Sequence, residues 1–262
     1  MPKAKAAEAK AAKQASKSLL GGARGLLINA LLAGFMGSVL RAMWQNRDLP
    51  KALAFYGSYH QDPMNQLIHF IFVPMLLWSF IMMLHYIPLL GCFVSQDLTL
   101  FGHRLTYGTL TAAAYSLYYP VLLDPVGGSM YTVVVLAFYA SANALVEVPP
   151  RDAVGLAKKS DAPSLSPKGA GATTKAIRAA VGCQVLGWYM QIHPGHAVFE
   201  GVKPALLDAL GQSLSVAPLF AFYEGVWAAG LHMQLHAQTA TLVSERRAAM
   251  CVADRSKYRF CL

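Results

Sequence analysis

The stretch "YGSYHQDPMNQLIHFIFVPMLLW", residues 56–78, places two histidines and an asparagine at the start of a run that is otherwise apolar. A helix that crosses a bilayer needs roughly 20 mostly apolar residues. Polar side chains in such a segment are costly unless they are paired or serve a function. His60, Asn65 and His69 therefore mark the start of a predicted membrane helix as a candidate functional site.

The chain as a whole has the composition of a membrane protein. Of its 262 residues, 55% are apolar and 13% are charged, whereas an average soluble domain carries about 25% charged residues. We predict an all-α fold, a polytopic membrane helix bundle with about six hydrophobic segments: residues 25–43, 67–90, 105–123, 131–146, 177–190 and 214–231. The first is short and rich in Gly and Ala, and the fifth contains Arg178 and Gln184, so either could lie in the interface or be re-entrant. The other four are expected to cross.

The net charge of +9 comes from three separate basic segments. We expect a basic Ala/Lys-rich N-terminal tail at 1–24, a single membrane domain at 25–236 with a flexible loop at 148–176, and a basic C-terminal tail at 237–262. Lys and Arg concentrate on the cytoplasmic side of membrane proteins, so the three segments should share that face, and six crossings satisfy this rule. Anionic membrane lipids suit this charge as partners, and no nucleic-acid motif accompanies it.

The first polar cluster adjoins a predicted helix start. Asp62 suits the N-cap position and Pro63 suits the first helical position. On that helix, Asn65 and His69 are four residues apart and share a face. His60 precedes the helix, so it need not follow the same helical phase and can converge with His69.

The second polar cluster lies in "MQIHPGHAVFEGVKPALL", residues 190–207. The His193-Pro194 junction predicts a short helix that begins at Pro194, on which His196 and Glu200 are four residues apart. Four predicted membrane segments separate the two clusters. An even number of crossings puts both clusters on one side of the membrane, which by the charge rule is the side away from the cytoplasm.

The four histidines of the two clusters offer the neutral imidazole nitrogens that transition metals bind. Asn65, Gln191 and Glu200 are polar neighbours that could orient such ligands. In the alternative interpretation, these side chains reach interfacial water or join helices through hydrogen bonds. "HMQLH", with His232 and His236, is a rival pair, but it lacks the glutamate of an HExxH site and is expected at the opposite membrane face.

Glu224 and the cysteines are the remaining candidates. An acidic side chain within a membrane segment is costly, so Glu224 is expected to face the polar clusters or to form a hydrogen bond between helices. The cysteines lack the close spacing that is typical of a zinc site or a redox pair. We expect all four to be unpaired: Cys92, Cys183, Cys251 and Cys261.

Two motifs give the chain a resemblance to a known family. "YGSYHQDPMNQLIHFIFVP" at 56–74 and "GHAVFEGVKPALLDAL" at 195–210 occur in this order, and "APLFAFYE" at 217–224 extends the second. Together they resemble the small endoplasmic-reticulum membrane dioxygenases that shorten 2-hydroxy fatty acids, whose fungal member acts in phytosphingosine breakdown. The chain departs from the family pattern at Phe72, where Gly is usual, and in "QIHPGH", which has one additional residue. The resemblance covers most of the chain, from about Phe55 to Trp227.

This resemblance implies an oxidoreductase of fatty acid alpha-oxidation and sphingolipid degradation. Its cofactor would be Fe(II), and its substrates would be a 2-hydroxy long-chain fatty acid, which loses one carbon, and dioxygen. The protein would be a multi-pass component of the endoplasmic reticulum membrane with cytoplasmic termini, and residues 25–236 would form the catalytic domain.

The resemblance also implies roles for individual residues. The metal ligands would be His60, His69 and His196. Supporting roles are expected for His193 as a fourth ligand or proton relay, for Glu200 and Asn65 as orienting groups, and for Lys203 as a partner of the substrate carboxylate.

Two other functions remain open from the residues alone. One is a non-catalytic membrane transporter or lipid-binding scaffold, in which the polar groups form a path through the protein. The other is a zinc-dependent membrane hydrolase, which needs an activated water but no dioxygen. Bound iron and substrate-dependent oxygen uptake distinguish the dioxygenase from both.

Overall fold

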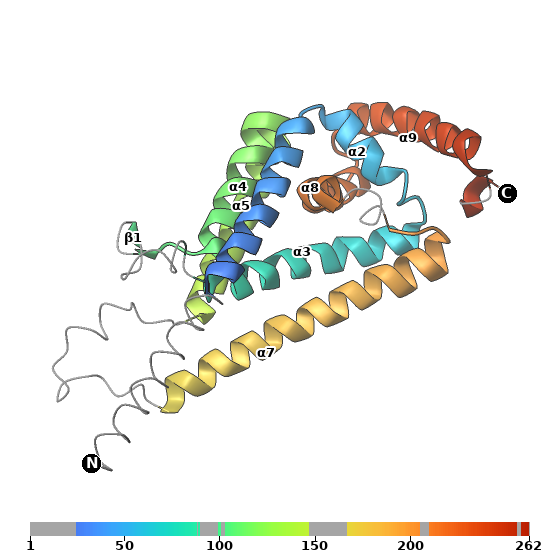
Figure 1. The fold of residues 1–262 in the computed structure, drawn as a ribbon. Helices are drawn as coiled ribbons and strands as arrows, with labels where there is room; N and C mark the ends of the chain where they lie inside the picture. Colours follow the sequence, from blue (N-terminus) through green and yellow to red (C-terminus); the bar gives the residue numbers. More distant parts are fainter. Residues whose placement is uncertain are drawn as a thin grey trace, which may run out of the picture.

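The computed structural model describes residues 25–87, 89, 99–100, 103–146, 167–204, 210–255 and 258–261, with the backbone alone at 99–100, 103–104 and 167–174. The expected N-terminal tail and most of the expected loop at 148–176 lie outside the described residues, and the rest of that loop is helical from Pro167 onward. Two antiparallel strands of two residues each, β1 (Thr99–Leu100) and β2 (His103–Arg104), pair with each other. The other regular elements of the described part are helices (Figure 1). The predicted all-α fold is confirmed.

Within the described part, three helices are long and apolar enough to cross a membrane: the N-terminal helix Gly25–Gln45, α3 (Pro63–His85) and α5 (Pro125–Leu145). They coincide with three of the six predicted segments, including the Gly/Ala-rich one. The other three segments form α4 (Tyr107–Leu117) with its π-helical extension η1 (Tyr118–Leu123), α7 (Pro167–Met190) and α8 (Leu210–Ala228). The α4 helix has only 11 residues, and polar residues interrupt the apolar sequence of α7 and α8, so these helices do not meet both requirements.

Asp-Pro pairs set the corners between helices. Asp62 caps α3, and Pro63 is the first residue of that helix, which confirms the predicted start. The Asp62 carboxylate accepts hydrogen bonds from the backbone N–H groups of Met64 and Asn65, at 2.8 and 3.2 Å. Asp124 repeats this arrangement at the start of α5. Each cap satisfies backbone donors that the first turn of a helix leaves without partners.

The α3 and α7 helices run antiparallel and side by side (Figure 1). Gln184 joins them, because its Nε2 donates to the Leu76 carbonyl and to the Ser79 hydroxyl, both at 2.8 Å. Gly187 permits the close approach, since a Cβ at that position would lie 2.7 Å from Leu76 Cδ2. The glutamine that interrupts the fifth predicted segment is therefore a link between two helices.

The α7 helix continues without a break into η2 (Gln191–Glu200), a π-helical segment that contains Pro194. The predicted helix start at Pro194 is therefore wrong. Proline has no N–H and its ring clashes with the preceding turn of an α-helix, whereas the wider π-helical turn, with its i→i+5 hydrogen bonds, has room for it. The η2 segment ends at Gly201, whose φ of 69° is the left-handed conformation that favours glycine at a helix end.

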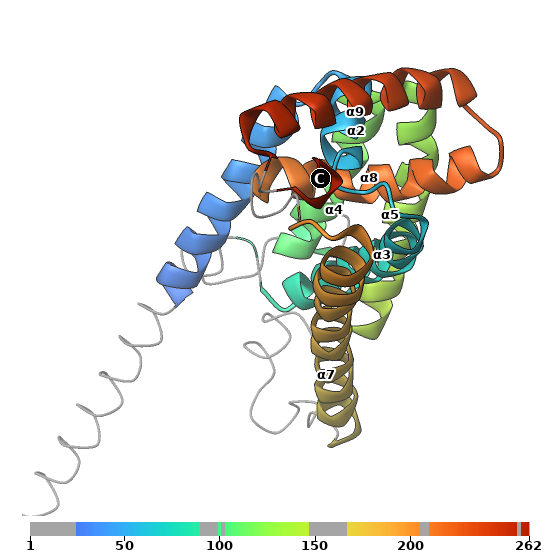
Figure 2. The same ribbon diagram turned by 90° about the vertical axis from the view of Figure 1, so that its right-hand side faces the viewer.

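The last two helices, α8 and α9 (Met233–Ala253), form a hairpin that lies across the other helices (Figure 2). The α9 helix packs on α2 (Leu49–Gly57), so the predicted basic C-terminal tail is largely a docked helix. Arg247 of α9 lies 3.7 Å from the Glu200 carboxylate at the end of η2. The prediction that the C-terminal segment and the polar clusters lie on opposite membrane faces is therefore wrong. It counted the segment 214–231 as a crossing, whereas α8 is not among the described helices that are long and apolar enough to cross a membrane.

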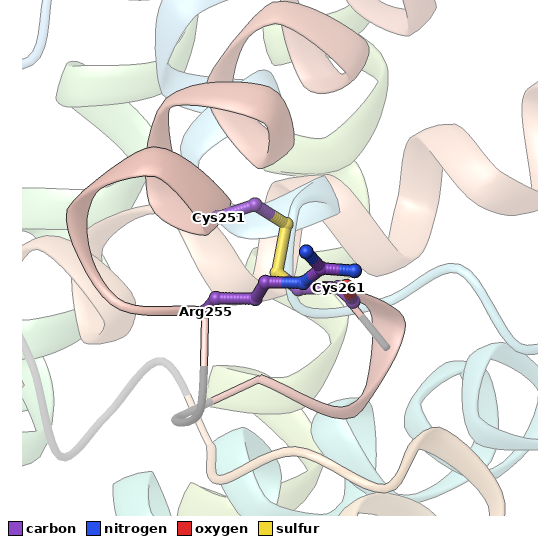
Figure 3. The surroundings of a disulfide bond; sticks show 3 residues. All are labelled: Cys251, Arg255 and Cys261. Atoms are coloured by element: carbon purple, nitrogen blue, oxygen red, sulfur yellow. Dashed lines mark hydrogen bonds between the residues drawn. A yellow bond between two sulfur atoms is a disulfide. The ribbon is translucent and has the colours of Figure 1, made fainter.

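After α9 the chain turns back on itself. A disulfide joins Cys251 to Cys261, whose Cα atoms are 5.4 Å apart (Figure 3). Arg255 Nε donates to the Cys261 carbonyl at 3.1 Å and braces the turn. The prediction of unpaired cysteines is wrong for these two, because the chain reversal brings together residues that are ten positions apart. Cys183 is a free thiol, and Cys92 lies outside the described residues.

Candidate metal centre

Three histidines from separate elements meet inside the protein. His60 lies in the turn after α2, His69 lies in the second turn of α3, and His196 lies in η2. The ring centroid of His60 is 4.3 Å from that of His69 and 4.8 Å from that of His196, and the last two are 5.1 Å apart. One ring nitrogen of each lies within 4.8 Å of the others, and each side chain is at least nine-tenths buried. This three-histidine cluster joins the two halves of the chain.

Hydrogen bonds determine which nitrogen of each ring is available. His60 Nδ1 lies 2.8 Å from the Tyr56 carbonyl, and His69 Nδ1 lies 2.9 Å from the Asn65 carbonyl. A carbonyl only accepts, so each Nδ1 carries the proton and each Nε2 keeps a lone pair. His60 Nε2 and His196 Nδ1 are buried and have no hydrogen-bond partner among the described residues. A bonded N–H on one side of the ring and a free nitrogen on the other are typical of metal-binding histidines.

The surroundings keep the two histidines outside the membrane helices uncharged. Burial lowers the pKa of His60 well below its ordinary value, and the neighbouring His69 and His196 lower it further. Burial, and then His69, lowers the pKa of His196 to about 3, although a backbone hydrogen bond with Val202 opposes this shift. Neutral imidazoles are the form that binds metal.

Glu200 ties the two halves of the site together. Its Oε2 accepts hydrogen bonds from the backbone N–H groups of Gln61 and Asp62, at 2.9 and 2.8 Å, and from Asn65 Nδ2 at 3.1 Å. The first two donors directly follow His60 in the chain. The Glu200 carboxylate therefore holds the turn that carries His60 against η2.

Gly195 lets η2 approach α3 closely. A Cβ at Gly195 would lie 2.5 Å from Asn65 Oδ1 and 3.5 Å from His69 Cε1. A larger residue would therefore push His196 away from the other two histidines.

Two contacts of the site were not predicted. Tyr56 stacks on His60, with ring centroids 4.0 Å apart and an interplanar angle of 7°. Tyr56 and His60 are four residues apart, a spacing that brings side chains together on a helix and could have indicated this contact. Arg247, 3.7 Å from Glu200, could not be found in this way, because it belongs to a helix that sequence analysis placed on the other membrane face.

The other predicted site residues lie outside the cluster. His193 is exposed, and its ring stacks on Tyr189 with 5.6 Å between centroids. Lys203 is half-buried just beyond the end of η2. His236 packs against Trp227, with ring centroids 4.9 Å apart, and does not join the three-histidine cluster.

Glu224 of α8 was expected to face the polar clusters or to form a hydrogen bond between helices. Both carboxylate oxygens are buried and have no hydrogen-bond partner in the described part of the chain. Burial raises the pKa of the Tyr56 phenol, and the Glu224 carboxylate raises it further. The expected hydrogen bond between helices is therefore absent among the described contacts of Glu224, and its position facing the polar clusters stays a prediction.

An elongated cavity of about 310 Å³ includes the three-histidine cluster in its wall. One face of α3 lines it from His69 to Phe80, a distance of about 16 Å at the helical rise per residue. At Phe80 the ring of Phe35 from the N-terminal helix meets it edge to face, with centroids 6.2 Å apart. None of the described lining residues is Lys, Arg, Asp or Glu. The cavity therefore suits a long apolar chain with a polar group at the histidines.

The fold and the site define a helical membrane protein in which a buried, metal-capable histidine cluster opens into an apolar cavity. Residues 46–227 match the model of the Mpo1-like family, described as 2-hydroxy-palmitic acid dioxygenase Mpo1-like, and the chain belongs to this family. It is 30% identical over 190 residues to the 2-hydroxy-palmitic acid dioxygenase MPO1 of Saccharomyces cerevisiae. The aligned region covers 72% of this chain and 86% of the yeast protein. No solved structure matches. The resemblance that rested on two motifs is confirmed.

Proposed function

We propose that this protein is an Fe(II)-dependent dioxygenase that removes one carbon from 2-hydroxy long-chain fatty acids. Three buried histidines in the wall of a cavity without Lys, Arg, Asp or Glu in its described lining carry this proposal. The histidines provide a site for a metal, and the cavity provides a site for an alkyl chain. Membership of the Mpo1-like family supports both the reaction and the substrate class.

The donor set fits a transition metal. His60, His69 and His196 would hold it through three neutral nitrogens, and Glu200 and Asn65 would keep these ligands in position. Imidazole suits iron and zinc alike, so the choice of iron rests on the family and not on the donors. Bound iron(II) would supply the redox chemistry that a reaction with dioxygen requires.

The surrounding residues would bind and orient the substrate. The apolar wall of α3 accepts the alkyl chain and excludes water. A 2-hydroxy acid would place its carboxylate and hydroxyl beside the histidines. The reaction balances without an external reductant: the acid and dioxygen give the one-carbon-shorter acid, carbon dioxide and water, and the four electrons lost by the acid are those gained by dioxygen.

We also propose a location, in which a lumenal C-terminal segment replaces the expected cytoplasmic one. We place the protein in the endoplasmic reticulum membrane, where it would act in sphingoid-base degradation. Disulfides persist in oxidising compartments, so the Cys251–Cys261 pair would lie on the lumenal side. The contact of Arg247 with Glu200 would put the histidine cluster on that side as well.

Oxygen uptake by the purified, Fe(II)-loaded protein tests the proposed function. With 2-hydroxypalmitate we expect uptake of one dioxygen per acid consumed, and mass analysis should identify pentadecanoic acid. Palmitate, which has the same chain but no 2-hydroxyl, is the matched control and should give no product. Bound iron without uptake would exclude this reaction, and absence of bound iron would favour a lipid-binding scaffold.

A further inference from the structure

Two polar side chains in the wall of the cavity, apart from the histidines, have no hydrogen-bond partner within the described structure. Most other polar side chains there are bonded: Gln184 Oε1 accepts from Trp188 Nε1 at 3.1 Å, and Thr111 donates to the Tyr107 carbonyl at 2.9 Å. Gln191 Nε2 and Ser213 Oγ are buried without a hydrogen-bond partner among the described residues. A buried donor without a partner is costly, so such a group indicates where a polar ligand atom binds.

The π-helical form of η2 puts one of these groups next to the cluster. Gln191 and His196 are five residues apart, which in a π-helix is the spacing of hydrogen-bonded turns, whereas in an α-helix it would point them to different faces. Gln191 is 6% exposed and His196 is 2% exposed, while His193 between them faces outward. Both buried side chains line the cavity. Ser213 lies on α8, a different element.

We propose that the Gln191 side-chain amide donates a hydrogen bond to the carboxylate of the bound 2-hydroxy acid and so positions the acid beside the histidine cluster. This inference rests on the proposed function. A buried carboxylate needs donors, and the described wall of the cavity contains no Lys or Arg. Gln191 supplies a donor there without the cost of burying a cation.

This assignment competes with the expectation that Lys203 binds the carboxylate. Lys203 does not line the cavity, although the next residue, Pro204, does. Gln191 has a free donor inside the cavity. Gln191 is therefore the better placed of the two groups, and substitution of each separates the two assignments.

The test is equilibrium binding to the iron-loaded protein under nitrogen, which needs no turnover. Tryptophan fluorescence reports occupancy, since Trp188 lines the cavity. Three ligands share one alkyl chain: 2-hydroxypalmitate, palmitate without the hydroxyl, and 1,2-hexadecanediol without the carboxylate. Gln191→Leu should weaken binding of both acids by about 10-fold to 100-fold, as expected for a hydrogen bond to a charged group, and leave diol binding unchanged. Lys203→Met should change none of the three.

The iron content and the melting temperature of Gln191→Leu should equal those of the wild type, which excludes an effect through the metal ligands or the fold. Equal acid binding by Gln191→Leu and wild type would overturn the inference, as would a loss confined to Lys203→Met. Equal weakening of acids and diol would show that Gln191 binds the hydroxyl or only shapes the cavity. If the wild type itself binds neither acid, the proposed function fails rather than the role of Gln191.

Discussion

The two ends of the cavity wall on α3 differ in what holds them in place. At the His69 end, hydrogen bonds from three elements converge, and Glu200 alone accepts three of them. At the Phe80 end, apolar side chains of two helices meet, and Phe35 closes the wall through a ring contact. Directional bonds fix the positions of a few atoms, whereas apolar contacts define a volume.

Under the proposed function, this difference assigns the reaction to the histidine end of the cavity and the choice of substrate length to the phenylalanine end. Changes at the histidine end should abolish metal binding and turnover for every substrate. Changes at the phenylalanine end should leave the metal in place and alter which chain length is preferred. Each variant below tests one side of that division.

The largest effect is expected for His69→Gln, which removes an imidazole but nearly keeps the side-chain volume. Loss of a neighbour that supports a metal ligand already costs 10-fold to 100-fold, so loss of a ligand should reduce iron affinity by more than about 100-fold and turnover in parallel. Iron content after desalting and oxygen uptake measure both. His236→Ala, outside the cluster, is the control and should retain its iron. An iron-replete, active His69→Gln protein would refute the assigned ligand set.

Glu200→Gln should have the next largest effect. The amide keeps the shape of the side chain, but its neutral oxygen is a weaker acceptor for the donors that Glu200 Oε2 binds, and its NH₂ group would face the Arg247 guanidinium. Iron affinity should fall by about 10-fold to 100-fold, as measured by iron titration. Glu245→Gln on the exposed face of α9 is the matched control. If both variants bind iron as the wild type does, Glu200 has no part in holding the turn of His60.

Phe80→Ala tests the opposite end. Removal of the ring opens the cavity toward Phe35, so longer chains should fit. The ratio of kcat/KM for 2-hydroxyarachidate to that for 2-hydroxypalmitate should rise by about tenfold, within the range that small changes in an apolar pocket produce, and iron content should not change. Ile71→Ala, on the same helix but 53% exposed, should leave the ratio as it is. An unchanged ratio in Phe80→Ala would show that the chain runs elsewhere.

Local chemistry explains which parts were predictable. Asp62 and Pro63 define a helix start through their own backbone and side chain, so the start of α3 was predicted correctly. The three histidines could be singled out because polar residues are conspicuous in an apolar sequence, and the two motifs supported them. The count of predicted segments between the two polar clusters placed both on one side of the membrane, which allowed the histidines to meet. Their actual distances depend on the whole fold.

The failures depend on long-range packing. Pro194 normally ends a helix, but α7 widens into η2 and continues past it, supported by its contacts with α3. The largely apolar sequence of α8 suggested a membrane crossing. In the structure, α8 and α9 form a hairpin over the other helices, which places α9 beside the site. Neither result can be read from a window of sequence, because each depends on which helix lies opposite.

Loss of the disulfide should have the smallest effect on function, and it tests whether the C-terminal hairpin acts only on the histidine end of the cavity. Cys261 anchors the turn in which Phe260 stacks on Arg247, with the guanidinium 3.7 Å from the ring centroid, and Arg247 in turn lies 3.7 Å from Glu200. A partly exposed ion pair contributes about 1 kcal/mol at most, so Cys261→Ser should lower iron affinity by about fivefold or less. The loop closed by the disulfide should stabilise the fold by about 2 to 3 kcal/mol, measurable as a lower melting temperature.

Cys183→Ser, which removes the free thiol, is the control and should change neither quantity. The chain-length ratio that Phe80→Ala alters should be the same in Cys261→Ser and in the wild type, because the disulfide reaches the cavity only through Glu200 and the histidine end. A shift in chain-length preference in Cys261→Ser would contradict the division between the two ends. It would mean that the C-terminal hairpin shapes the apolar part of the cavity as well.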